Sequence, residues 1–272
     1  MKKIISIIIL LSIVICSSAL NPVKEYSVSP DEFGMSYSEI NFKTKDGLNL
    51  FGWYFNAPKK SGKAIILSHD GDGNMGDLIE LAGQFVSAGY NVLTYDYRGY
   101  GKSDDFKINT KFYIYAQFVK DLEAAIEFVR VRKSGITTVH LYGQGIGAGL
   151  SLSVGADNKR VTKVIADSPY TTLLDIQKKF ADIKGENILI PLAYDKNILE
   201  PKFALENKYA KLKSYLFIVG DEDEFYSPKE IKSLSKIVKA TASIYVVKGA
   251  KANSTFITDK AKYFEEIREF VN

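Results

Sequence analysis

Short apolar runs alternate with longer amphipathic segments along most of this chain. The short runs predict strands at residues 64–69, 91–95, 139–142, 161–166, 215–219 and 243–247. Between them, apolar positions recur at helical spacing and predict helices at 77–88, 112–132, 229–238, 259–271 and one that begins after Gly147. An opening hairpin is expected over 33–44 and 48–58, with its turn at Asp46-Gly47. This alternation predicts an α/β fold with a central, mostly parallel eight-stranded sheet flanked by helices.

Length and composition indicate one domain. The chain has 272 residues, of which 46% are apolar and 25% charged, so it can bury a full core over residues 20–272. Residues 173–209 have weaker periodicity and contain Pro191 and Pro201. We expect this segment to form a small cap between strands 6 and 7, where a lid over an active site would lie.

The charge pattern excludes a nucleic-acid partner. The formal net charge is only +4, and no basic run with interleaved aromatic residues occurs.

The first residues have the pattern of a targeting segment. Met1-Lys2-Lys3 is basic, and the apolar run from Ile4 to Ile15 is too short to span a bilayer but suits a signal peptide. We expect residues 1–19 to be cleaved after Ala19 and the protein to be exported, whether periplasmic, at the cell surface or secreted. Alternatively, cleavage before Cys16 would leave a lipidated cysteine and attach the protein to a membrane. Cys16 is the single cysteine, so the mature chain has no disulfide and no cysteine nucleophile.

A glycine-rich turn follows the predicted strand at 139–142. Residues 139–149 predict a strand, a tight turn and the start of a helix, which is the setting of the G-x-S-x-G nucleophile elbow. The serine position is Gly145, which has no hydroxyl group. Glycine also tolerates the strained backbone angles of an elbow at low cost.

Four further segments accompany this turn in a fixed order. They are residues 69–74, 95–103, 167–171 and 220–223, and Asp96 to Ser103 comes close to D-x-R-G-x-G-x-S. Together the five segments resemble the α/β-hydrolase fold, specifically its serine-aminopeptidase-like and monoacylglycerol-lipase-like group. The resemblance covers about residues 37–272. It implies a Ser-His-Asp triad and an oxyanion hole made by backbone N–H groups.

The residues at the implied triad positions do not provide that chemistry. Asp223 stands at the acid position, but Gly145 replaces the nucleophile and Ala252 stands at the histidine position. The oxyanion hole would use Ile146 and the loop that carries Asp70 and Gly71. In the family this loop usually begins His-Gly, whereas here two carboxylates, Asp70 and Asp72, oppose a developing anion. We therefore expect a degenerate triad and a pseudo-hydrolase that binds a small apolar or ester-like ligand, or a protein partner. The alternative is an active hydrolase of acyl esters with a non-standard site.

Other polar residues near these motifs complete the candidate site. We expect the ligand cleft to be lined by His69, Asp72, Gln144, Tyr170 and Lys251. Lys251 could pair with Asp223, although a solvated lysine is the simpler interpretation. His140 is expected to be a hydrogen-bonded core residue, and Ser103 and Ser168 to shape turns.

Two other interpretations rest on weaker motifs. Gly143, Gly145 and Ala148, followed by Asp167, match a dinucleotide-binding fingerprint. Asp70, Asp72 and Asn74 resemble the start of a calcium loop, but Met75 and Leu81 occupy positions where that loop needs glycine and an acid. We therefore expect neither a cofactor nor a metal.

Overall fold

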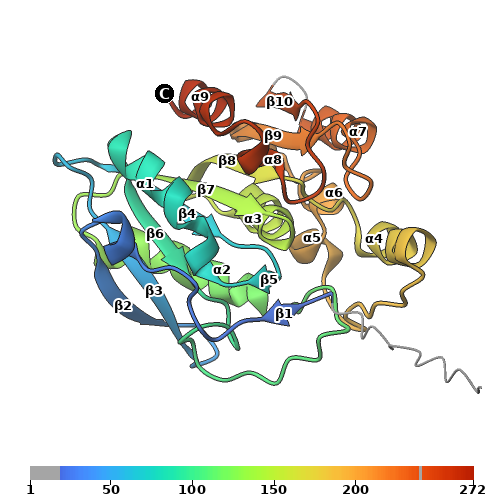
Figure 1. Ribbon diagram of the computed structural model, residues 1–272, viewed down its shortest axis with the longest axis horizontal. Coiled ribbons are helices and arrows are strands. Elements are labelled where there is room, and N and C mark those ends of the chain that lie inside the picture. The colour runs from blue at the N-terminus through green and yellow to red at the C-terminus, as the bar shows by residue number, and fades with distance from the viewer. Residues whose placement is uncertain (1–18, 239–240) are drawn as a thin grey trace, which may run out of the picture.

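The computed structural model describes residues 19–238 and 241–272 and contains the predicted eight-stranded sheet (Figure 1). The strand order is β10-β9-β8-β7-β4-β6-β3-β2. Only the β2–β3 and β3–β6 pairs are antiparallel. The bounds are β2 Ser38–Lys43, β3 Asn49–Phe55, β4 Lys63–Ser68, β6 Asn91–Tyr95, β7 Thr138–Gln144, β8 Val161–Asp167, β9 Ser214–Gly220 and β10 Ala242–Val247. The predicted fold class is confirmed.

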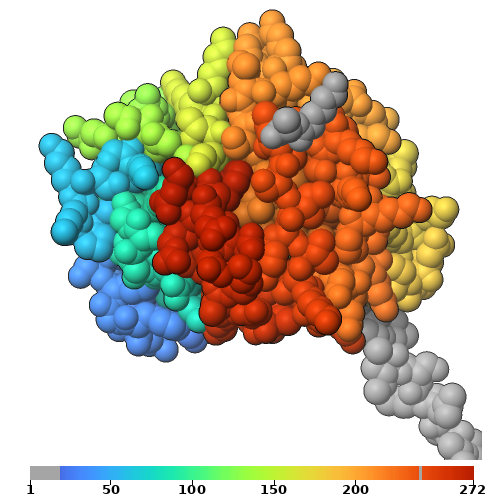
Figure 2. All heavy atoms as spheres, turned by 90° about the horizontal axis from the view of Figure 1, so that it is seen from above, coloured from blue at the N-terminus to red at the C-terminus, as the bar shows by residue number. Residues whose placement is uncertain are grey.

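Helices cover both faces of the sheet. Helices α1 (Ile79–Ser87) and α9 (Lys260–Val271) bury apolar side chains in one core cluster. Helices α2 (Phe118–Glu127), α3 (Ile146–Asp157) and α7 (Pro228–Val238) contribute to the cluster on the other face. Figure 2 shows the C-terminal helix α9 next to α1, and an ion pair between Lys260 and Glu80 joins these two helices.

One helix is shorter than its periodicity predicted. The predicted helix 112–132 begins only at Phe118, and its last turn, Phe128–Arg132, is a π-helix. Phe112 forms an isolated bridge with Leu189, and the amide of Tyr113 donates to the Leu189 carbonyl at 2.9 Å. The prediction was wrong for residues 112–117 because backbone pairing with a distant segment replaces helical hydrogen bonds there.

The segment between β8 and β9 contains only short elements. They are α4 Leu173–Lys179, a π-turn at Phe180–Lys184, α5 Lys196–Leu199, α6 Pro201–Ala204 and a 3₁₀ turn at Lys208–Leu212. This is the segment predicted to be a cap. Leu199, Ala204 and Leu205 are buried in the main core, so its second half packs as part of the domain.

Near the N-terminus, a two-residue strand that the sequence pattern does not predict, β1 (Asn21–Pro22), pairs in parallel with β5 (Asp72–Gly73). The remaining elements are two 3₁₀ turns, Pro30–Phe33 and Met75–Leu78, and helix α8 (Thr255–Thr258).

A buried charge network fixes the loop after β6. The Arg98 guanidinium is 2% exposed and lies 2.7 Å from Asp121 Oδ1 and 2.9 Å from Asp46 Oδ2. Ser103 Oγ accepts the amide of Phe51 and donates to the Asp96 carbonyl. These bonds give the D-x-R-G-x-G-x-S stretch a structural role, as expected for Ser103.

The predicted signal segment lies outside the described residues except for Ala19. Among the helices that the structure describes, none combines the length and the apolar character needed to cross a membrane.

Candidate active site

The elbow is present without its nucleophile. Gly145 connects β7 to α3 with φ 54° and ψ −116°, and its amide donates to the Asp167 carbonyl at 3.0 Å. A positive φ of this kind is rare for residues other than glycine. The turn is also tight, because a Cβ on Gly143 would lie 2.0 Å from the Gly147 carbonyl oxygen. The prediction that the glycine sits at strained elbow angles is confirmed.

The carboxylate of Asp70 occupies the space above this elbow. A Cβ on Gly145 would lie 2.1 Å from Asp70 Oδ1 and 2.3 Å from its Cγ. The same Oδ1 accepts the backbone N–H of Ile146 at 2.9 Å. Burial raises the pKa of Asp70, and the hydrogen bond from Ile146 opposes that rise. Asp70 therefore fills the place of the missing side chain and takes the N–H group that would form the oxyanion hole.

Asn253 reaches the site from the loop after β10. Its side-chain Nδ2 donates to Asp70 Oδ2 at 2.9 Å, and its backbone has φ 58°. Sequence reasoning placed Ala252 at the histidine position and missed Asn253. The available signal was weak: asparagine tolerates a positive φ and often occupies tight turns. The loops after β4 and β10 are thus joined above the elbow by one carboxylate.

Asp223 is retained but has lost its partner. It follows β9 and is 4% exposed, and its Oδ1 accepts the amides of Phe225 and Tyr226 at 2.9 and 2.8 Å. Within the described chain, its Oδ2 has no hydrogen-bond partner. Burial raises the pKa of Asp223. Lys251 is exposed, and among the described residues no ion pair joins it to Asp223. The acid therefore remains without a base to orient.

A second buried carboxylate, Asp167, is fully hydrogen-bonded within the core. It accepts hydrogen bonds from the hydroxyls of Thr255, Tyr263 and Ser168. Tyr263 also bonds to Tyr142 on β7 at 2.9 Å. Burial raises the pKa of Asp167 to about 6. Since this carboxylate ties α8 and α9 to the sheet, it is not placed to hold a ribose, and the dinucleotide interpretation has no support in the structure.

Neither histidine is paired as a catalytic base. His69 Nδ1 donates to the Asp70 carbonyl, and its Nε2 lies 4.0 Å from Asp96 Oδ1 with no hydrogen bond to any described residue. His140 bonds to Thr162 at 2.8 Å and is 3% exposed, which confirms its assignment to the core. Burial lowers the pKa of each imidazole to about 4.

The other predicted cleft residues are dispersed. Asp72 is exposed and accepts from Asn21 Nδ2 at 2.8 Å. Tyr170 is buried, and its hydroxyl donates to the Leu199 carbonyl at 2.6 Å. Gln144 is half-buried at the end of β7. In the part of the chain that the structure describes, no three His, Cys, Asp or Glu side chains are grouped to hold a metal ion.

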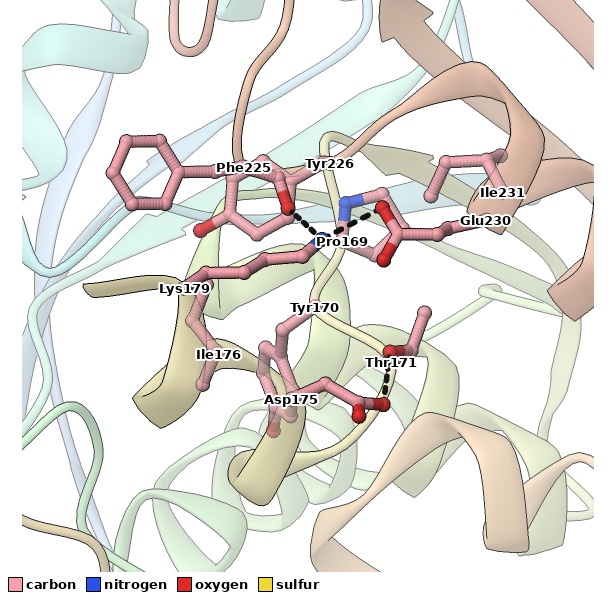
Figure 3. Close-up of a pocket in the computed structure, with 10 residues that line it drawn as sticks. All are labelled: Pro169, Tyr170, Thr171, Asp175, Ile176, Lys179, Phe225, Tyr226, Glu230 and Ile231. Carbon is pink, nitrogen blue, oxygen red and sulfur yellow. Dashed lines mark hydrogen bonds and ion pairs between the residues drawn. The ribbon is translucent and has the colours of Figure 1, made fainter. Parts of the chain in front are cut away.

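A small pocket and an adjoining groove lie beside α4. A pocket of about 10 Å³, with room for one water, lies between α4 and the loop after β9. Figure 3 shows Lys179 across this pocket, where its ammonium bonds to the Phe225 carbonyl and to Glu230. An adjoining groove of about 610 Å³ between α4 and α7 shares Thr171 and Asp175 with the pocket. Of the predicted cleft residues, Tyr170 lines the smaller pocket, and none of them lines the groove.

Residues 59–207 match the family of serine aminopeptidases, S33. The chain belongs to this family of α/β hydrolases. Bem46 from Schizosaccharomyces pombe is 25% identical to it, over 91% of this chain and 81% of that protein. The α/β hydrolase domain-containing protein WAV2 from Arabidopsis thaliana is 23% identical, over 78% and 70% of the two chains. The Pyrococcus furiosus esterase Pf2001 shares the fold with a TM-score of 0.75 at 20% identity, over 92% of this chain and 98% of that one. The resemblance inferred from the motifs is confirmed.

Proposed function

We propose that this α/β-hydrolase-like protein does not hydrolyse esters or peptides and acts by binding. One observation carries the proposal: the Asp70 carboxylate lies in the nucleophile's space and accepts the Ile146 N–H at 2.9 Å. The site that should hold a tetrahedral intermediate is therefore already filled by a side chain of the protein itself.

The electrostatics of the elbow also oppose hydrolysis. An oxyanion hole works by directing preorganised donors at a developing negative charge, and loss of one donor typically costs about 2.7–4 kcal/mol of barrier. Here Ile146 donates to a carboxylate instead. A substrate oxygen would need to displace Asp70 and would then develop negative charge beside it. No serine, cysteine or threonine stands at position 145 to begin the reaction.

Covalent labelling tests this proposal. The mature protein is incubated with an alkyl fluorophosphonate, which phosphonylates activated serines, and its intact mass is measured. We expect no adduct. An Asp70→Gly/Gly145→Ser/Ala252→His variant, and a second with Asn253→His in place of Ala252→His, restore the missing groups around Asp223. An adduct on the native protein would overturn the proposal.

The second candidate function is hydrolysis of acyl esters through a non-standard site. The retained, buried Asp223 favours it, since this carboxylate stands at the acid position and its Oδ2 has no hydrogen-bond partner among the described residues. In that case the native protein would be labelled, and Asp223→Ala would weaken the labelling.

We further propose that the protein is exported and that its ligand is a small apolar or ester-like molecule or a protein partner. The basic and apolar pattern of residues 1–19 supports export. The mass of the mature N-terminus distinguishes the two routes: cleavage after Ala19 leaves Leu20 first, whereas lipidation leaves a modified Cys16. An unprocessed Met1 in the cytoplasmic fraction would contradict export.

A further inference from the structure

Residues 19–26, called the strap below, run across the loop that carries Asp70 and Gly71. β1 of the strap lies beside β5 of that loop, away from the main sheet (Figure 1). The strap precedes the first strand of the main sheet, β2, so it adds to the fold rather than forming part of the sheet.

The backbone of the strap is hydrogen-bonded to several loops of the domain. The amides of Asn21 and Val23 donate to the carbonyls of Gly71 and Gly73 at 2.8 and 3.2 Å. Pro22, which has no N–H, stands between these two donors, where none is needed.

The amides of Ala19 and Leu20 both donate to the Thr110 carbonyl, at 2.8 and 3.0 Å. The Gly101 amide donates to the Val23 carbonyl at 3.0 Å. Pairing of an extended segment with a neighbouring strand, as β1 pairs with β5, is one way in which proteins bind peptides.

Leu20 anchors the strap beside the elbow. Its side chain is 0% exposed and belongs to the same core cluster as Ile146. A Cβ on Gly71 would lie 2.6 Å from Leu20 Cδ2 and 3.1 Å from Ile146 Cδ1. Gly71 has no positive φ, so the glycine is needed here for space and not for its backbone angles. The absent side chain at position 71 is what admits the leucine.

Polar side-chain contacts also hold the strap. Asn21 Nδ2 donates to Asp72 at 2.8 Å, and Lys24 pairs with Asp105 at 2.9 Å. Asn74 Nδ2 donates to the carbonyls of Val23 and Glu25 at 3.3 and 2.8 Å. At the end of the strap, the Tyr26 hydroxyl donates to the buried Asp96. The strap is therefore held through its extended backbone, one buried aliphatic side chain and, four residues later, a basic side chain.

We propose that the slot that holds the strap, formed by residues 71–74, Gly101, Asp105 and Thr110, is a peptide-binding site and that the strap is its resident occupant. The ligand class is an extended polypeptide with a branched aliphatic residue at the Leu20 position and a lysine or arginine at the Lys24 position. The proposal deepens the binding role proposed above and rests on it. Failure of this proposal can be distinguished from failure of the proposed function, because its test measures peptide affinity and not turnover. Cleavage after Ala19 would keep Leu20, so export by that route leaves the anchor intact.

In the test, the strap is cut from the rest of the protein and removed. A protease recognition sequence is inserted after the exposed Ser27, the full chain is folded and cleaved, and the strap is dialysed away. A fluorescent peptide with the sequence of residues 19–26 is then titrated by anisotropy, beside its Leu20→Asp and Lys24→Glu versions. We expect saturable binding that Leu20→Asp weakens by at least about tenfold, because the Leu20 side chain is fully buried and a charged group there would be desolvated. Equal binding of the native and Leu20→Asp peptides, or no binding by cleaved protein that retains its circular dichroism spectrum, would overturn the proposal.

A substitution in the intact chain tests the same contact without cleavage, so its result does not depend on whether the cleaved protein stays folded. Gly71→Ala places a methyl group against Leu20 without backbone strain, so it should release the strap and speed hydrogen exchange at the amides of Asn21 and Val23. Gly83→Ala is the matched control, since a Cβ there meets only Met35 at 3.4 Å. Unchanged exchange in Gly71→Ala would show that Leu20 is not the anchor and would overturn the proposal.

Discussion

The Asp70 carboxylate occupies the space that a side chain at Gly145 would need, because a Cβ on Gly145 would lie 2.1 Å from Asp70 Oδ1. The carboxylate can hold the Ile146 amide only because position 145 has no side chain. A serine at 145 could fit only if Asp70 moved. The two departures from the family pattern, Asp70 and Gly145, therefore form one structural unit. We expect reversal of either one alone to lower the free energy of unfolding.

The first prediction follows from this unit. Gly145→Ser should lower the free energy of unfolding, because the new side chain meets Asp70 and adopts a φ near 54° that costs about 1–3 kcal/mol. In an Asp70→Gly background the loss should be smaller, since the contact is gone and only the backbone strain remains. Urea unfolding of the four proteins in this double-mutant cycle measures the coupling. Additive effects would mean that Asp70 does not occupy this space.

The buried charges behind the site give a second prediction. Asp121→Ala should lower the free energy of unfolding by about 3–5 kcal/mol, because it leaves the Arg98 guanidinium buried with only Asp46 as counter-ion. Glu123→Ala removes the acid of an exposed pair with Lys45 and should cost about 1 kcal/mol or less. Thermal or urea unfolding of both variants checks this. Similar losses in the two would contradict the structural role of Arg98.

Asp167 predicts a pH dependence of stability. Burial raises its folded pKa to about 6 from an ordinary value of 3.8, so between these values the folded protein binds more protons than the unfolded chain. The contribution of Asp167 to the free energy of unfolding is fully present below pH 4 and is lost as the pH rises through 6. At 1.36 kcal/mol per pKa unit the loss is about 3 kcal/mol.

The variant Asp167→Asn isolates that contribution. The two buried histidines change stability in the opposite direction over this range, but they are present in both proteins and cancel in the comparison. The difference in unfolding free energy between native protein and variant should therefore shift in favour of the variant as the pH rises from 4 to 6. A difference that is constant with pH would show that Asp167 titrates normally.

The sequence predicts the parts of this molecule that depend on local pattern. Strand β7, the Gly145 turn and helix α3 follow from an apolar run, a glycine cluster and helical periodicity, and all three are present. The filling of the elbow was not predictable, because it depends on Asp70 and Asn253, which are 183 residues apart, meeting over it. The spacing of residues along the chain contains no information about such a contact.

The strap was missed for a related reason. Leu20 and Asn21 lie beside a targeting pattern and show no periodicity, and β1 has only two residues. Backbone hydrogen bonds to the carbonyls of Gly71 and Thr110 fix the positions of these two residues. The misassigned start of the helix at 112–117 has the same origin, since Leu189 provides the competing backbone partner.

Turnover of a series of short- and long-chain nitrophenyl esters by the purified protein tests most directly whether the elbow is inactive. We predict a rate no higher than buffer for the native protein and for Asp223→Ala alike, with turnover gained only when Asp70→Gly, Gly145→Ser and a histidine at 252 or 253 are combined. Native turnover that Asp223→Ala abolishes would contradict it, because a working acid requires a base and a nucleophile at this elbow.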